Sequence, residues 1–172
     1  MSTPFPLQSS TAEIFAFDKA NVETASASFF PAPLTVFEDY MFLDSSAAYP
    51  TAIICRFRFG GRLDVARFRQ ALELALRRHP LFACRVEKIG GRRCWVPDDA
   101  PLDFVEARRE TVPGADGSDF FESVRPFRLD REPGLRTTVI WDDVSADVVF
   151  RCCHAVSDGT GLKSFVADAL VE

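Results

Sequence analysis

The side chains best suited to chemistry lie close together near the end of the sequence, in the run CCHAVSDG from Cys152 to Gly159. His154 is one of only two histidines, the other being His79. An imidazole has an ordinary pKa of about 6.5, so a neutral histidine can accept a proton at neutral pH. Asp158 could orient the loop through an ion pair or cap a following helix, and Gly159 allows backbone conformations that other residues resist. The run predicts a general-base site, with a strand-end histidine and a helix cap as the purely structural alternative.

Other chemistries fit the same residues less well. Ser157 does not lie in the G-x-S-x-G pattern of a nucleophilic serine, because Ala155 and Val156 precede it. The glycines that follow do not match a phosphate-binding loop, because leucine and not lysine comes directly after Gly161. Five cysteines form an odd set without a C-x-x-C pair, so we expect neither a disulfide framework nor a metal site. A reactive thiol at Cys153, beside the histidine, is a further alternative.

Charge and hydropathy exclude two broad classes of protein. The chain has 20 basic and 25 acidic residues, a net charge of −5, which removes the general attraction to nucleic acid. No run reaches the ~18 apolar residues of a membrane helix, and residues 1–10 lack the basic and apolar regions of a signal peptide. We therefore expect no nucleic-acid partner, no membrane span and a cytoplasmic location.

Hydrophobic periodicity predicts the elements that must position the histidine. Apolar residues at helical spacing predict a short helix over 35–44, with an apolar stripe formed by Val36, Phe37, Tyr40 and Leu43. Alternation over 53–59 predicts a strand with one buried face, ended by a glycine pair. Asp64 is expected to cap a helix that runs to about Arg78, before His79 and Pro80. His79, at this helix end, is assigned a structural role.

The second half of the chain is expected to be richer in strands. In order, we predict a hairpin over 82–88 and 92–96, a strand over 103–108, a short helix over 118–124, an extended connection over 126–134, strands over 135–141 and 147–153, and a final helix with Leu162, Phe165, Val166, Ala169 and Leu170 at helical spacing. Along the last strand, Val148, Phe150, Cys152 and His154 share a face. This order predicts an α+β domain, with helices packed on a mainly antiparallel or mixed sheet.

The run His154 to Gly159 spells H-x-x-x-D-G, which resembles the active-site motif of the chloramphenicol-acetyltransferase-like superfamily. That superfamily contains coenzyme A-dependent acyltransferases and the condensation domains of nonribosomal peptide synthetases. Cys153 stands where condensation domains carry the first of two histidines. Further segments resemble the family in the same order: LDVARFRQALELALRRHPLFACRV at 63–86, PFRLD at 126–130 followed by PGLR at 133–136, and, more loosely, 35–43. The resemblance covers about residues 35–172.

This resemblance implies a mechanism. In the family, the motif histidine is a general base that takes a proton from an acceptor alcohol or amine, which attacks the thioester of acyl-coenzyme A or of an acyl chain on a phosphopantetheinyl carrier protein. It implies that His154 is catalytic and that Asp158, followed by Gly159, forms a structural ion pair with an arginine. Since Ala83 stands at the usual arginine position, Arg136 and Arg85 are the alternative partners. Neither a metal nor a permanently bound cofactor is implied, and the family resemblance implies a place in secondary metabolism.

Family members have two similarly built halves, and this chain resembles the N-terminal one. We expect residues 1–172 to form an N-terminal subdomain, with a poorly defined leader over 1–34 and without the C-terminal subdomain. Such a half should expose an apolar face that meets the missing half or another subunit, and by itself it is expected to be inactive. The expected function is acyl transfer from a thioester to an alcohol or amine. The alternative is a noncatalytic binding or assembly module that keeps the fold.

Overall fold

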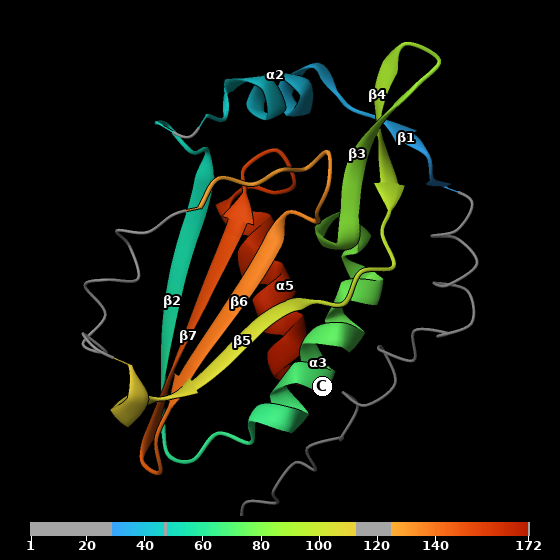
Figure 1. The fold of residues 1–172 in the computed structure, drawn as a ribbon. Helices are drawn as coiled ribbons and strands as arrows, with labels where there is room; N and C mark the ends of the chain where they lie inside the picture. Colours follow the sequence, from blue (N-terminus) through green and yellow to red (C-terminus); the bar gives the residue numbers. More distant parts are fainter. Residues whose placement is uncertain (1–28, 47, 113–124, 172) are drawn as a thin grey trace, which may run out of the picture.

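The computed structural model describes residues 29–46, 48–112 and 125–171, and this part of the chain forms two sheets with helices packed against them (Figure 1). In chain order the elements are β1 (Ala32–Pro33), α2 (Val36–Asp44), β2 (Ala52–Gly60), α3 (Val65–Arg78), β3 (Cys84–Ile89), β4 (Arg92–Pro97), β5 (Asp103–Arg108), β6 (Leu135–Trp141), β7 (Ser145–Cys153) and α5 (Gly159–Val171), with short 3₁₀ helices at Pro80–Ala83 and Arg109–Thr111. None of the described helices is long and apolar enough to cross a membrane.

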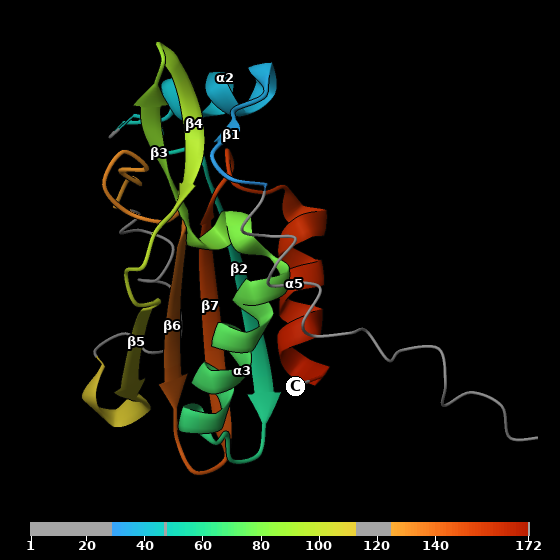
Figure 2. The same ribbon diagram turned by 90° about the vertical axis from the view of Figure 1, so that its right-hand side faces the viewer.

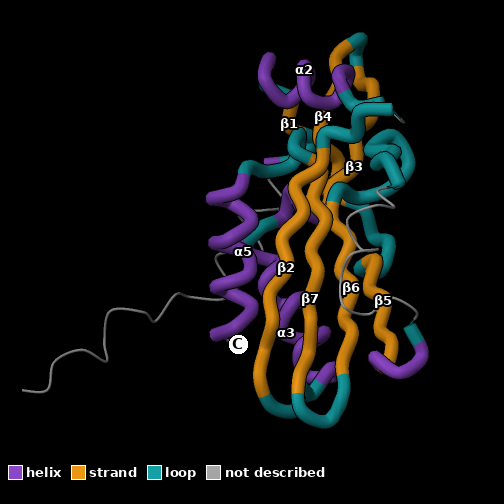
Figure 3. Tube along the Cα trace, turned by 90° about the vertical axis from the view of Figure 1, so that its left-hand side faces the viewer, coloured by secondary structure: helices purple, strands orange, loops and turns teal. Residues whose placement is uncertain are grey.

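The larger sheet has the strand order β2-β7-β6-β5, and the smaller one has the order β1-β4-β3. Neighbouring strands are antiparallel except for β5 and β6, which run parallel. Helices α3 and α5 lie side by side on one face of the larger sheet (Figures 2 and 3). The expected α+β fold, with helices on a mixed sheet, is confirmed.

The core lies between the larger sheet and this pair of helices. Val148, Phe150 and Cys152 of β7 are fully buried, and the Phe150 ring meets the Phe165 ring of α5 edge to face. Alternation makes every second residue of β7 face the helices, and 3.6 residues per turn place the α5 apolar residues on one side. Each large side chain buried here contributes roughly 1.5–3 kcal/mol to folding.

Helix α2 lies across one end of the larger sheet, beside the β3–β4 hairpin (Figure 1). A capping box starts it: the Glu38 side chain accepts from the Thr35 N–H, and the Thr35 hydroxyl accepts from the Glu38 N–H. The predicted apolar stripe does not face the core, because Val36 is 91% exposed and Leu43 is 59% exposed. Met41 and Phe42 pack against the core instead. The helix is therefore apolar on two sides: Val36, Tyr40 and Leu43 form its outer side, and Phe37 lies at the edge of that side, in contact with His154.

Two further predicted elements differ from those in the structure, and a third cannot be compared with it. The first hairpin strand begins at Cys84 and not at Phe82, because Phe82 lies in the 3₁₀ helix that follows α3. The connection over 126–134 is not fully extended, since the N–H groups of Arg131 and Glu132 both donate to the Arg128 carbonyl. The helix predicted over 118–124 lies outside the described residues.

The sheet face opposite α3 and α5 carries a charged cluster centred on Asp147 of β7. Its side chain is 2% exposed and accepts hydrogen bonds from Arg56 and Arg58 of β2, both at 2.9 Å, and from Arg109 at 2.8 Å. Burial alone would raise the pKa of Asp147, but the three arginines outweigh it and hold that pKa well below its usual range. Because the pKa is lowered by folding, the cluster stabilises the fold above the pKa of an unfolded aspartate, and the effect is lost as the pH falls.

We therefore expect Asp147→Asn to lower the free energy of unfolding at pH 7 by about 2 kcal/mol. This loss is smaller than the ~3–5 kcal/mol expected when one partner of a wholly buried ion pair is removed, because the arginines can still reach water. Urea unfolding followed by circular dichroism measures the change, and the gap between wild type and variant should narrow below about pH 4. Asp143→Asn is the control, because the Asp143 side chain is 77% exposed. Equal losses in the two variants at pH 7 would contradict the assignment.

Candidate functional site

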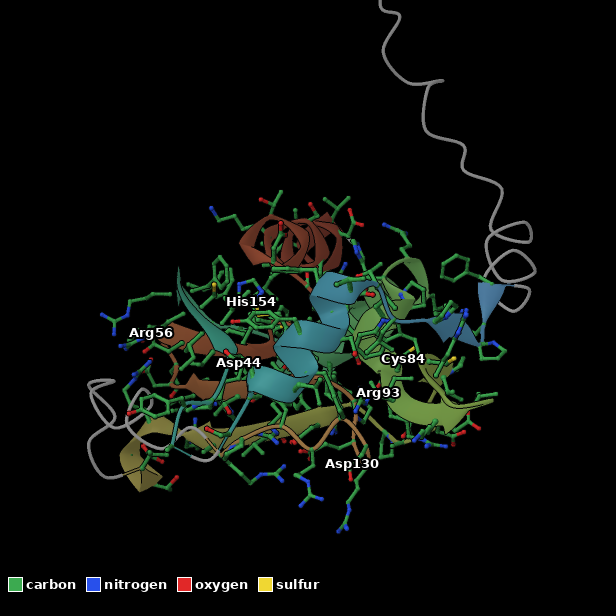
Figure 4. The ribbon with its side chains drawn as sticks, turned by 90° about the horizontal axis from the view of Figure 1, so that it is seen from above. Asp44, Arg56, Cys84, Arg93, Asp130 and His154 are labelled. Atoms are coloured by element: carbon green, nitrogen blue, oxygen red, sulfur yellow. The ribbon has the colours of Figure 1, made fainter. Side chains whose placement is uncertain are left out.

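His154 lies in the turn that follows β7, at the end of the larger sheet beneath α2 (Figure 4). Its backbone N–H donates to the Thr51 carbonyl at 3.0 Å, just before β2 begins. The turn closes when the Val156 N–H donates to the Cys153 carbonyl, also at 3.0 Å. Because both bonds involve residues next to paired strands, the main chain of His154 is fixed by the sheet itself.

His154 is a partly exposed residue, and one of its two ring nitrogens is buried. Its Nδ1 is buried and has no hydrogen-bond partner within the described part of the chain, so the nitrogen that can meet an approaching group is Nε2. The ring of Phe37, from α2, meets the imidazole edge to face at 6.5 Å between centroids. A histidine held by its main chain and by an aromatic neighbour, with Nε2 accessible, can take a proton from a bound hydroxyl or amine.

Asp158 caps helix α5. Its carboxylate accepts from the Gly161 N–H at 2.7 Å, and its carbonyl accepts from the Leu162 N–H at 3.1 Å. These bonds satisfy N–H groups that have no partner inside the helix, and the negative charge suits the helix N-terminus. Of the two roles predicted for Asp158, the structure shows the cap.

The predicted ion pair between Asp158 and Arg136 or Arg85 is not formed. Arg136 donates to Glu132 at 2.6 Å and to the carbonyls of Arg125 and Pro126, and it also lies near Asp103. Arg85 pairs with Glu87 and Asp98. Both arginines are therefore paired with carboxylates that lie nearby in the chain or on or beside a neighbouring strand, and not with Asp158 at the start of α5.

The predicted backbone role of Gly159 is also not observed. Among the described glycines, positive φ angles occur at Gly61, Gly90 and Gly91, while Gly159 begins α5 in ordinary helical geometry. A Cβ added at Gly159 would meet nothing within 4 Å, whereas one at Gly161 would lie 2.2 Å from the Ser157 hydroxyl. Gly161 is thus the more constrained glycine of the two, although the Ser157 hydroxyl can rotate away.

Cys153 does not have the surroundings of a reactive thiol. It is 1% exposed, and burial raises the pKa of its thiol above the ordinary value, which disfavours the thiolate. Its N–H donates to the Gly134 carbonyl, as part of the sheet. No group of three or more histidine, cysteine, aspartate or glutamate side chains is gathered in the described ranges as metal ligands would be.

His79, the second histidine, lies at the end of α3 and contacts α5. Its Nε2 lies 2.7 Å from a carboxylate oxygen of Asp168 on α5, and its ring meets the Phe165 ring edge to face. The structural role predicted for His79 agrees with these contacts.

Sequence reasoning missed the two residues that contact His154 from outside the motif, Phe37 and Thr51. Phe37 was placed on an apolar stripe, and Thr51 only preceded a strand. No spacing links either residue to the motif. Only the pairing of β2 with β7 and the position of α2 bring them together.

No protein-family model matches this sequence, and no curated protein matches it. Solved structures do match the fold. The starter condensation domain of rhizomide synthetase RzmA matches with a TM-score of 0.70 and 13% identity, over 80% of this chain and 36% of that chain. The X-domain in complex with OxyB from teicoplanin biosynthesis matches with a TM-score of 0.68 and 20% identity, over 81% and 32%. The condensation domain from the Monacolin K polyketide synthase MokA has a TM-score of 0.64 and 16% identity, over 80% and 33%.

The chain therefore has the fold of one part of a condensation domain. It spans about a third of the length of each of these three neighbours. At these identities the likeness shows the fold alone, and the chemistry depends on the residues around His154.

The cap assigned to Asp158 can be separated from an ion pair by two substitutions. Asp158→Ala should lower the free energy of unfolding by about 1 kcal/mol, because a helix cap is lost. Asp158→Asn should cost only a few tenths of that, about 0.3 kcal/mol, because asparagine caps as well as aspartate and only the favourable charge is removed. Urea unfolding at pH 7 measures both. If the asparagine variant were as unstable as the alanine variant, the charge and not the cap would be the important feature.

Proposed function

We propose that this chain is the histidine-bearing part of an acyltransferase that moves an acyl group from a thioester to an alcohol or amine. The observation that carries the proposal is His154, fixed by β2 and β7 with Nε2 accessible, within the condensation-domain fold. The donor is acyl-coenzyme A or an acyl chain on a phosphopantetheinyl carrier protein, and neither is a permanently bound group. Residues 1–172 serve as the N-terminal subdomain of the enzyme, and we place it in the cytoplasm.

The reaction needs one base at the reacting atoms. His154 Nε2 takes the proton of the acceptor O–H or N–H, and the freed lone pair attacks the thioester carbonyl carbon. The tetrahedral intermediate collapses, the C–S bond breaks, and the thiolate leaves with a proton returned by the imidazolium. Because a thioester is already activated, positioning and a single base account for much of the rate.

The noncatalytic alternative is a binding or assembly module. It is favoured by the match to the X-domain, which was solved in complex with OxyB. It also fits the apolar outer side of α2, formed by Val36, Tyr40 and Leu43, each more than half exposed. In either function, we propose that polypeptide equivalent to the missing half of the fold covers this side.

Release of free thiol from acyl-coenzyme A, with a panel of alcohols and amines, tests the enzymatic function. The assay is run on the 172-residue chain and on the longest chain that contains it. We expect His154→Ala to lower the rate by about 10²–10⁴-fold, the range for loss of a general base. Ser157→Ala is the matched control beside it, and its rate should be unchanged. An active preparation whose rate survives His154→Ala would disprove the general base, and absence of turnover in every chain would favour the binding module.

A further inference from the structure

Helix α2 is attached to the β3–β4 hairpin through one arginine, Arg93. No residue of α2 is fully buried. Arg93, on β4, donates from Nη1 to the Asp39 carboxylate at 2.7 Å, and its guanidinium lies 5.2 Å from the centre of the Phe42 ring. The Arg93 carbonyl also accepts from the Leu34 N–H at 3.0 Å, just before the helix. Arg93 thus contacts the entry to α2 with its backbone and the middle of the helix with its side chain (Figure 4).

The other end of α2 is tied to Thr51, the residue that also holds His154. The Thr51 hydroxyl donates to the Met41 carbonyl, and the Thr51 N–H donates to the Ser45 hydroxyl, both at 3.3 Å. The Thr51 carbonyl accepts from the His154 N–H. The C-terminal end of α2 and the main chain of His154 therefore share one point of attachment.

Thr51 and the packing of Met41 and Phe42 on the core hold the C-terminal half of α2. Arg93, through Asp39, holds the turn before it. Phe37 lies in the first turn of α2, one turn before Met41, and its ring packs against the His154 imidazole. A small rotation of α2 about its C-terminal end would move Phe37 most. We propose that Arg93 is a positioning residue: by holding Asp39 and Phe42 it keeps Phe37 against His154 and so keeps the imidazole in one orientation.

The ion pair between Arg93 and Asp39 can be removed without unfolding the protein. Arg93 and Asp39 are each 37% exposed in their side chains, and ion pairs of that exposure contribute little to the free energy of unfolding. Arg92, the preceding residue on β4, is exposed, and its side chain makes no hydrogen bond, ion pair or ring contact with the residues that the structure describes, so Arg92→Ala is a matched control of equal charge change.

The test uses nuclear magnetic resonance of the imidazole protons in the 172-residue chain. Only two histidines are present, so His79 serves as an internal reference in every spectrum. Phe37→Leu defines how far the His154 signals move when the neighbouring ring is lost. We expect Arg93→Ala to move the His154 signals in the same direction, Arg92→Ala to leave them unchanged, and the His79 signals to stay fixed in all three variants.

Conservative variants separate positioning from a general loss of stability. Arg93→Lys keeps a charge for Asp39 but loses the flat contact with Phe42, and should restore the His154 signals in part. Asp39→Asn should move them less than Arg93→Ala, because the Phe42 contact remains, and it replaces Arg93→Ala if that variant does not fold. His154 signals that stay in place in Arg93→Ala or Asp39→Asn, while Phe37→Leu moves them, would overturn the inference. The inference would also be overturned if Phe37→Leu itself left the His154 signals unchanged.

The catalytic consequence of this inference rests on the proposed acyl transfer. In a chain that is active, Arg93→Ala should lower kcat/KM roughly tenfold through kcat, since a misplaced base slows the chemical step, while Arg92→Ala should not. If the wild-type chain shows no acyl transfer but the His154 signals move as expected, the proposed function fails and the positioning role stands. If Arg93→Ala retains full activity in an active chain, the positioning role is wrong and the proposed function stands.

Discussion

The antiparallel pairing of β2 with β7 is the constraint on which the arrangement around His154 depends. The two strands pair without interruption from Ala52 opposite Cys153 to Gly60 opposite Ser145. On its other side β7 pairs with β6, and its central residues are fully buried. The bond from the His154 N–H to the Thr51 carbonyl follows directly after the last pair. The main chain of a histidine in this place is held by a central strand, while its ring lies beyond the end of that strand.

The same constraint changes how the H-x-x-x-D-G run should be interpreted. Asp158 caps α5, and α5 must start there so that Leu162 and Phe165 meet the buried face of the sheet. A strand that turns into a packed helix needs such a cap whatever the protein does. The aspartate is therefore explained by folding, and it adds little to the evidence for catalysis. That evidence comes from His154 alone, from its fixed main chain and its accessible Nε2.

Much of the fold could be predicted from the sequence because local signals agree with burial. The strands β2, β6 and β7 alternate or are rich in β-branched residues, and Asp64 caps α3 as its position suggests. The orientation of α2 could not be predicted, because it has apolar residues on both sides and periodicity shows only that an apolar side exists. The partners of Arg136 were missed for another reason. They are set by a turn and by the neighbouring strand β5, so the resemblance to a family motif could not identify them.

The residues that contact His154 are not those that form the exposed outer side of α2. Thr51, Phe37 and the turn after β7 all belong to this chain, so the described contacts of His154 lie within it. The outer side of α2, opposite the side that packs on the core, is apolar and exposed. An acyl donor and an acceptor must be enclosed on more than one side before water is excluded from a thioester. Under the proposed acyl transfer, orientation of the base and enclosure of the substrate are then separate tasks: the first depends on the sheet end and α2, and the second on whatever covers the exposed side of that helix.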